Sequence, residues 1–405
     1  MIVNLTDIKI EKSMTVIVFS LLLVSSFTQM IGFVFDLGFR ATTNFLILTA
    51  IFGIVSIFFN LRSNKFLLPN KLLLILYIYI YLVIILILQS YLYPNLFDST
   101  GRSALEYVRS YTIGGMLWLT IGLSLGLANV KIKKNQNLSI LIVFGLLLVL
   151  SFIDKSGLVI NYSELKDSRA DSVDYSHLVI GHFVVILLLS SLAFNRKWEI
   201  LILVLGLLIC FTVGGRSDVF IFILTFFIYN LLFDKKKMWF SLLSLVLAGL
   251  TFIFVVGLSF FKDTKFNFLL SGEKDDSWEL RKLIFHKNIE NLYSQFFIGN
   301  PNKIITTDFG VSELYNNVGA YSHNIFSVWQ FYGFVFFLFI CCFIFFTAVK
   351  IFNISRSKLK VDVLEKFFIL LFLFSAISLV FVKSINYYPI WLCMGYWLTK
   401  FRFKF

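Results

Sequence analysis

The side chain best suited to acid–base chemistry is His323, one of only 4 histidines among the 405 residues. It lies in the stretch Tyr321-Ser-His-Asn324, directly before a long apolar run, so we expect it at the start of a helix. An imidazole with a pKa near neutral can take a proton from an attacking hydroxyl group. Alternatively, a histidine beside a helix start can have a purely structural role in the helix cap. The sequence leaves the catalytic and the structural role open.

Three arginines lie in polar stretches that adjoin apolar segments: Arg169, Arg216 and Arg281. Arg216 belongs to the turn Gly214-Gly-Arg-Ser-Asp218, where the two glycines permit a tight backbone and the approach of a bulky ligand. Planar guanidinium groups bind phosphate oxygens through paired hydrogen bonds and keep their charge at physiological pH. Together, the three arginines predict a site for an anionic phosphate group.

Each of these basic residues also has a purely structural interpretation. A single arginine can contact lipid headgroups or form an ion pair, and the near candidates are Arg216 with Asp218 and Arg109 with Glu106. His177, which precedes an apolar run, suits helix packing as well as function. We therefore regard three residues as supporting candidates for the site: Asn324, His177 and Arg109.

The elements that must position these residues are membrane helices. Hydrophobic residues make up 59% of the chain and charged residues 15%, whereas soluble domains have about 25% charged residues. Many windows of roughly 20 residues carry no charge, which is enough to cross about 30 Å of hydrocarbon. The formal net charge of +13 fits lysines that set topology and meet anionic lipids, so nucleic acid is not an expected partner.

The apolar segments predict an all-α polytopic membrane protein with about 12 transmembrane helices in a single domain, residues 1–405. The predicted helices are 14–35, 41–60, 72–93, 108–128, 138–154, 176–194, 199–214, 217–233, 239–260, 325–347, 367–384 and 388–400. The connectors between these segments are alternately rich and poor in basic residues, and those rich in basic residues are expected in the cytoplasm. Both termini are then cytoplasmic, and the candidate site faces the opposite, outer side.

The longest connector, residues 261–324 between the ninth and tenth predicted helices, is the one substantial polar element. The stretch Asp276-Ser-Trp-Glu279 matches a helix capping box, and apolar residues recur at helical spacing from Trp278 to Phe296. This pattern predicts an amphipathic helix within an extracytoplasmic loop, and Arg281 lies on it.

Three segments resemble those of bacterial O-antigen polymerases and the related O-antigen ligases. They are Arg169-Ala-Asp-Ser-Val-Asp-Tyr-Ser-His177, then Gly214-Gly-Arg-Ser217, then the long outer segment from Ser277-Trp-Glu-Leu-Arg-Lys282 to Ser322-His-Asn-Ile-Phe326, followed by Gln330-Phe-Tyr-Gly333. Their order and spacing carry the resemblance. The chain departs from the family in having Gly-Asn-Pro at the end of the loop helix and Gly-Gly in place of the commoner Gly-Ser.

The resemblance implies a GT-C-like glycosyltransferase in the bacterial inner membrane, with its active site facing the periplasm. Such a polymerase transfers the growing glycan from undecaprenyl diphosphate to the non-reducing end of a new lipid-linked repeat unit. By this resemblance, Arg169, Arg216 and Arg281 bind the diphosphate and stabilise the leaving group. His323 orients or deprotonates the acceptor hydroxyl. A flippase and a chain-length regulator are the expected protein partners in the membrane.

The sequence leaves two alternative functions open. An O-antigen ligase or another polysaccharide polymerase would share the same motifs, and a lipid-linked oligosaccharide flippase would also have many spans. Transporters often contain internal repeats and discontinuous helices, whereas this chain shows no repeat and its prolines lie in or beside connectors. The outer segments hold no acidic cluster with metal-ligand spacing, so we expect a metal-independent enzyme without a cofactor.

Overall fold

The computed structural model of the chain is all-helical over the residues that it describes, with no β-strand among them. These residues are 5–35, 39–63, 69–93, 103–128, 177–194, 199–212, 216–234, 296–300, 324–357 and 361–401, together with isolated positions between 239 and 286. The predicted all-α class is confirmed for this part of the chain.

Each helix whose bounds the structure defines overlaps one of the predicted apolar segments, although α1 begins and α14 ends beyond the predicted range. They are α1 (Leu5–Phe35), α2 (Phe39–Ser63), α3 (Pro69–Leu92), α4 (Ala104–Leu127), α8 (His177–Phe194), α9 (Glu199–Thr212), α10 (Arg216–Phe233), α14 (Phe326–Arg356), α15 (Val363–Phe381) and α16 (Tyr388–Lys400). The predicted helix at 138–154 lies outside the described residues, and of the predicted helix at 239–260 and the amphipathic helix of the outer loop only isolated helical positions are described.

Several helices begin earlier than their apolar pattern predicts, and in α4 and α15 polar side chains cap the extended start. In α4, the Ser103 hydroxyl accepts the Glu106 amide at 3.2 Å and the Glu106 carboxylate accepts the Ser103 amide at 3.1 Å. In α15, the Asp362 carboxylate accepts the Glu365 amide at 2.8 Å. Such caps satisfy amide groups that have no partner within the helix. Each helix therefore extends about one turn beyond its apolar run.

Four helical stretches within the described ranges are long and apolar enough to cross a membrane: Leu73–Leu92, Val108–Leu127, Phe326–Arg356 and Val363–Phe381. The outward side of α3 supports this interpretation, because it exposes a stripe of large apolar side chains at Leu73, Leu76, Tyr77, Ile80, Val83, Ile84 and Ile87. An apolar face of this length is not left in contact with water. The chain is a helical membrane protein.

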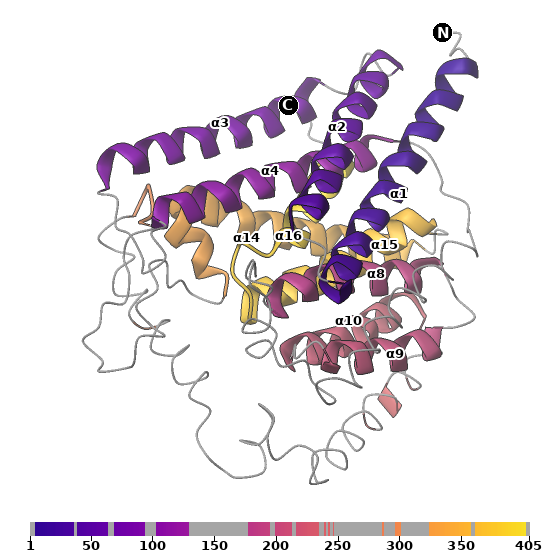
Figure 1. Cartoon of the computed structure of the whole chain (residues 1–405). Helices are drawn as coiled ribbons and strands as arrows, with labels where there is room; N and C mark the ends of the chain where they lie inside the picture. The colour runs from indigo at the N-terminus through magenta and orange to yellow at the C-terminus, as the bar shows by residue number, and fades with distance from the viewer. Residues whose placement is uncertain are drawn as a thin grey trace.

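The helices form a bundle in which α15 and α16 occupy the middle (Figure 1). In the view of Figure 1, α3 and α4 run along one side of the bundle, and α9 and α10 lie on the opposite side. The burial pattern agrees with this arrangement, because α16 is buried along its length from Pro389 to Thr399.

The tightest packing joins α4 to α16 through glycines. A Cβ atom added at Gly122 of α4 would lie 2.0 Å from the Leu392 carbonyl oxygen, and one added at Gly395 of α16 would lie 2.1 Å from the Leu119 carbonyl oxygen. Backbones can approach this closely only where both side chains are hydrogen atoms. Gly126, one turn beyond Gly122, extends the same contact. These glycines therefore let α4 and α16 touch backbone to backbone.

We predict that Gly122→Ala destabilises the bundle by about 1–3 kcal/mol, because the new methyl group must push α16 away from α4. The matched control is Gly53→Ala, at which a Cβ atom would lie 3.4 Å from the Ser124 hydroxyl oxygen and meet no backbone atom below 3.8 Å. Thermal unfolding in detergent should show a lower midpoint for the first variant and little change for the second. Equal midpoints for the two variants would contradict the close contact.

Candidate functional site

Several predicted site residues lie at the starts of helices. His177 is the first residue of α8 and Arg216 is the first residue of α10, although the structure does not describe their side chains. Asn324 comes two residues before α14 begins at Phe326. The remaining predicted residues, Arg169, Arg281 and His323, lie outside the described residues, so their roles stay predictions.

A buried ion pair connects the start of α10 to the linker between α15 and α16, residues 382–387. The ammonium group of Lys383 lies 3.1 Å from one carboxylate oxygen of Asp218 and 3.2 Å from the other. The two side chains are only 5% and 4% exposed. The sequence offered Arg216 as a neighbour for Asp218, whereas the structure supplies Lys383, which is 165 positions away and was not singled out.

The start of α8 lies against the same ion pair. A Cβ atom added at Gly181 would lie 2.9 Å from the second carboxylate oxygen of Asp218, so glycine leaves the space that the carboxylate occupies. Because His177 precedes Gly181 by four positions, it lies about one helical turn from the pair. The starts of α8 and α10 are therefore neighbours.

Hydrogen bonds attach the start of α14 to the same linker. The Ser327 hydroxyl accepts the Ile385 amide at 2.8 Å and donates to the Asn324 carbonyl at 2.8 Å. The Asn324 side chain accepts a hydrogen bond from the amide of Phe326, the first residue of the helix, at 3.0 Å. The Ile385 carbonyl accepts the indole N–H of Trp391 at 2.9 Å. Asn324, the residue after His323, is thus fixed relative to the linker that carries Lys383.

The helix starts that carry His177, Arg216 and Asn324 therefore gather around the α15–α16 linker. Sequence analysis predicted that these residues share the outer face of the membrane protein, and that orientation stays a prediction. The contacts also identify groups that sequence analysis did not single out, above all Lys383 and Tyr387. Burial raises the pKa of the Tyr387 phenol well above its ordinary value, and the Asp218 carboxylate raises it further, so this phenol stays protonated.

Close to this end of the bundle, α14 is broken at Gly333, which has φ 80° and ψ 175°. The break frees backbone groups that a continuous helix would pair, and four of them have partners outside the helix. The carbonyls of Gln330, Phe331 and Tyr332 accept hydrogen bonds from the Asn300 amide at 2.9 Å, the Gln89 side chain at 2.7 Å and the Tyr81 hydroxyl at 2.8 Å. The Phe334 amide donates to the Phe296 carbonyl at 2.9 Å. Inside a membrane, unpaired backbone groups would be costly.

The segment Phe296–Asn300, within the predicted outer loop that carries Arg281, fits into this break. A Cβ atom at Gly333 would lie 1.8 Å from the Phe297 carbonyl oxygen, so only glycine fits there. The Ile298 and Gly299 carbonyls accept hydrogen bonds from Gln89 at 2.9 Å and from the Tyr93 hydroxyl at 2.8 Å. Sequence analysis treated 325–347 as one continuous helix. The signal that it missed is the glycine of Gln330-Phe-Tyr-Gly333.

Arg109 has a structural contact. Its guanidinium group donates to the Ser90 hydroxyl of α3 at 2.9 Å at an exposed position. Glu106, which sequence analysis considered as its partner, caps α4 through Ser103. Arg109 therefore links the start of α4 to the end of α3, and nothing in its described contacts points to a ligand.

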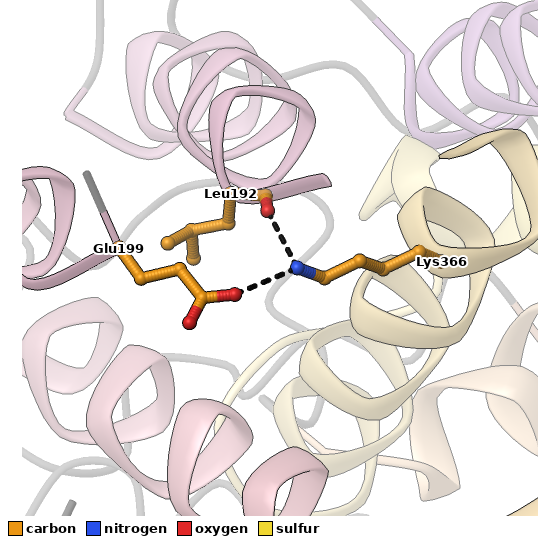
Figure 2. A network of polar contacts seen from close by, with 3 residues as sticks. All are labelled: Leu192, Glu199 and Lys366. Carbon is orange, nitrogen blue, oxygen red and sulfur yellow. Dashed lines mark hydrogen bonds and ion pairs between the residues drawn. The ribbon is translucent and has the colours of Figure 1, made fainter. Parts of the chain in front are cut away.

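A second, partly buried ion pair lies at the other end of α15. Figure 2 shows the ammonium group of Lys366 between the Glu199 carboxylate, at 2.9 Å, and the Leu192 carbonyl, at 2.8 Å. Lys366 and Lys383 are separated by 17 positions, which corresponds to roughly 25 Å along a helix. The two pairs therefore join α15 to the α8–α10 side of the bundle at opposite ends.

Comparisons of the chain with protein-family models, with curated proteins and with solved structures gave no match. Any statement on function therefore depends on the motifs of the sequence and on the arrangement of the helix starts.

We predict that Gln89→Leu destabilises the protein, because Leu removes the donor that serves the buried Phe331 and Ile298 carbonyls. Each unpaired carbonyl costs roughly 1–3 kcal/mol. Ser90→Ala, on the exposed side of the same helix turn, is the control and should have little effect. Limited proteolysis of the outer loop should be faster in the Gln89 variant than in the control. Proteolysis at the wild-type rate would contradict the proposed role of Gln89 at the break.

Proposed function

We propose that the chain is an O-antigen polymerase. It transfers a growing glycan from undecaprenyl diphosphate to the non-reducing end of a new lipid-linked repeat unit. The observation that carries the proposal is the gathering of three helix starts around one linker. These starts carry His177, Arg216 and Asn324, which come from the three segments that resemble the polymerase and ligase family.

The physical chemistry of this end of the bundle suits an anionic substrate. Helix N-termini carry partial positive charge and unpaired amide groups, and here the N-termini of α8, α10 and α14 lie near one another. In the proposed mechanism, the guanidinium groups of Arg169, Arg216 and Arg281 bind the diphosphate and stabilise the charge that develops on it as the leaving group. Arginine suits this role because it can bind two phosphate oxygens at once.

His323 activates the acceptor in this proposal. Its neighbour Asn324 is held by the Phe326 amide and by Ser327, so the backbone beside the imidazole has a defined position. The imidazole orients the acceptor hydroxyl and takes its proton as the new glycosidic bond forms and the bond to the diphosphate breaks. The lipid diphosphate departs with the electron pair of that bond.

The proposal includes an orientation in the membrane. We propose about 12 spans, cytoplasmic termini, and an outer loop over residues 261–324 that faces the periplasm, because basic residues concentrate in the alternate connectors. In this orientation, the helix starts that gather around Lys383 face the periplasm, where lipid-linked repeat units become available after a flippase has moved them across the membrane.

One structural feature favours a flippase as the second candidate. The broken helix α14 resembles the discontinuous helices that transporters use, so the absence of prolines within spans no longer argues against transport. However, the three carbonyls before the break already accept hydrogen bonds from Asn300, Gln89 and Tyr81. The break therefore serves contacts within the protein. An O-antigen ligase shares the proposed motifs and differs in its acceptor.

Lipopolysaccharide from a strain that lacks this chain distinguishes the three functions. A polymerase deficiency leaves lipid A core that bears a single repeat unit, because the flippase and ligase still act. A ligase or flippase deficiency leaves bare core. We expect the single-repeat band on a gel, and restoration of the ladder by the wild-type chain. Bare core would contradict the polymerase proposal.

We predict that Arg216→Lys and His323→Gln each abolish the ladder while expression and membrane insertion stay normal. Lysine keeps the charge but loses the paired hydrogen bonds, and glutamine cannot take a proton at neutral pH, a loss of typically 10²–10⁴-fold. The matched control is Arg356→Lys, an exposed residue in the last turn of α14, which should retain the ladder. A full ladder in either site variant would remove that residue from the proposed mechanism.

A further inference from the structure

We propose that Asp218 and Lys383 are positioning residues of the candidate site, an inference that rests on the proposed function. The family resemblance does not assign a substrate contact to either residue. Their ion pair fixes the start of α10, and with it Arg216, relative to the α15–α16 linker. The linker in turn fixes the start of α14, next to His323.

The burial of this pair argues for a role beyond stability. Removing two charges from water costs several kcal/mol per ion, and an apolar pair of similar volume is often as stable. Charged side chains inside membrane bundles therefore mark functional regions more often than structural ones. Asp218 and Lys383 form their ion pair at the start of α10, where the predicted phosphate-binding residue Arg216 lies. Positioning of Arg216 is therefore a function that this pair can have.

The contacts around Lys383 explain how it acts on its neighbours. Its ammonium group lies over the ring of Tyr387 at 5.9 Å from the centroid, within the same linker. Between these two residues, the Ile385 amide donates to Ser327, and the Ser384 hydroxyl contacts the Asn386 side chain. The linker therefore has one set of contacts toward α10 and another toward α14. Loss of the ion pair should release the first set and loosen the second.

Gly181 provides an independent way to disturb the same arrangement. It leaves room for the Asp218 carboxylate, because a Cβ atom would lie 2.9 Å from the carboxylate oxygen. A methyl group at position 181 would displace the carboxylate while both charges remain in the protein. Gly181→Ala should therefore weaken the positioning without leaving a buried charge that has lost its partner residue.

The other buried ion pair, Lys366 with Glu199, is a matched control within the same protein. It joins α15 to the α8–α9 region at the end away from the candidate site (Figure 2), and its side chains are partly buried, 15% and 9% exposed. If buried ion pairs serve only stability here, apolar replacement of either pair should have the same effect. If the Lys383 pair positions the site, only its replacement should affect the reaction.

The experiment compares two double variants, Asp218→Leu with Lys383→Met and Glu199→Leu with Lys366→Met. Each receives a reporter, Ser384→Cys, in a background without the 4 native cysteines. Ser384 is 3% exposed, so a thiol there should react slowly with a polar maleimide while the linker is in place. Three quantities are measured for the purified proteins: the unfolding midpoint, the rate of thiol labelling, and turnover of lipid-linked repeat units.

We expect the first double variant to fold with an unfolding midpoint close to that of the control, and to label faster at position 384. Its kcat should fall on the order of 10²-fold, with little change in the KM for the acceptor, because a small displacement of catalytic groups has an effect of this size. The control pair should leave labelling and kcat unchanged. Gly181→Ala should reproduce the faster labelling and a smaller loss of kcat, including where the first double variant does not fold.

Wild-type labelling and wild-type kcat in the first double variant, or in a folded Gly181→Ala protein, would overturn the inference. The same holds if both double variants lose kcat equally. A different result separates this inference from the proposed function. Faster labelling at position 384 in a protein whose wild type forms no polymer would support the positioning of the helix starts and would contradict the polymerase activity.

Discussion

The lack of water inside a bilayer is the constraint on which the rest of this structure depends. A backbone amide, a carbonyl or a charge that leaves the aqueous phase must find its partner within the protein. The break in α14 shows the consequence most clearly, because the carbonyls of Gln330, Phe331 and Tyr332 receive donors from three different elements. Those donors attach α3 and the Phe296–Asn300 segment to the start of α14.

The same constraint explains why the two buried ion pairs lie near the ends of α15. Lys366 and Lys383 stand at either side of the apolar run, where each can reach a carboxylate on a neighbouring helix without placing a charge in the middle of the bundle. Because one pair lies at each end, α15 is held in register with the helices that it contacts. Only the pair at Lys383 also contacts the region in which the predicted site residues lie.

Close packing of helix backbones also holds the bundle together, in addition to the polar contacts. Helices in a membrane gain little from burying apolar side chains, since lipid is equally apolar, so they associate where their backbones approach closely. The contact between Gly122 and Gly395 is of this kind, and it places α16 firmly against α4. The linker that begins α16 therefore has a stable support on one side and the Lys383 pair on the other. A site built on such a linker can hold its geometry.

The sequence by itself determined the helical class and the approximate positions of the helices that the structure describes, because long uncharged runs leave no other stable form in a membrane. It also placed His177, Arg216 and Asn324 at helix starts, where apolar runs begin after polar turns. The resemblance to O-antigen polymerases, and the roles of Arg169, Arg281 and His323, are predictions from the sequence that the structure leaves as they were.

Only the tertiary structure decided which of these helix starts are neighbours. The partner of Asp218 is 165 positions away, and no local pattern could identify it, since any basic residue on the same side of the membrane would suit the carboxylate equally. The break at Gly333 was likewise hidden, because a single glycine within an apolar run is compatible with a continuous helix. The physical reason is the same in both cases: the stabilising partners come from distant parts of the chain, so they exist only once the bundle has assembled.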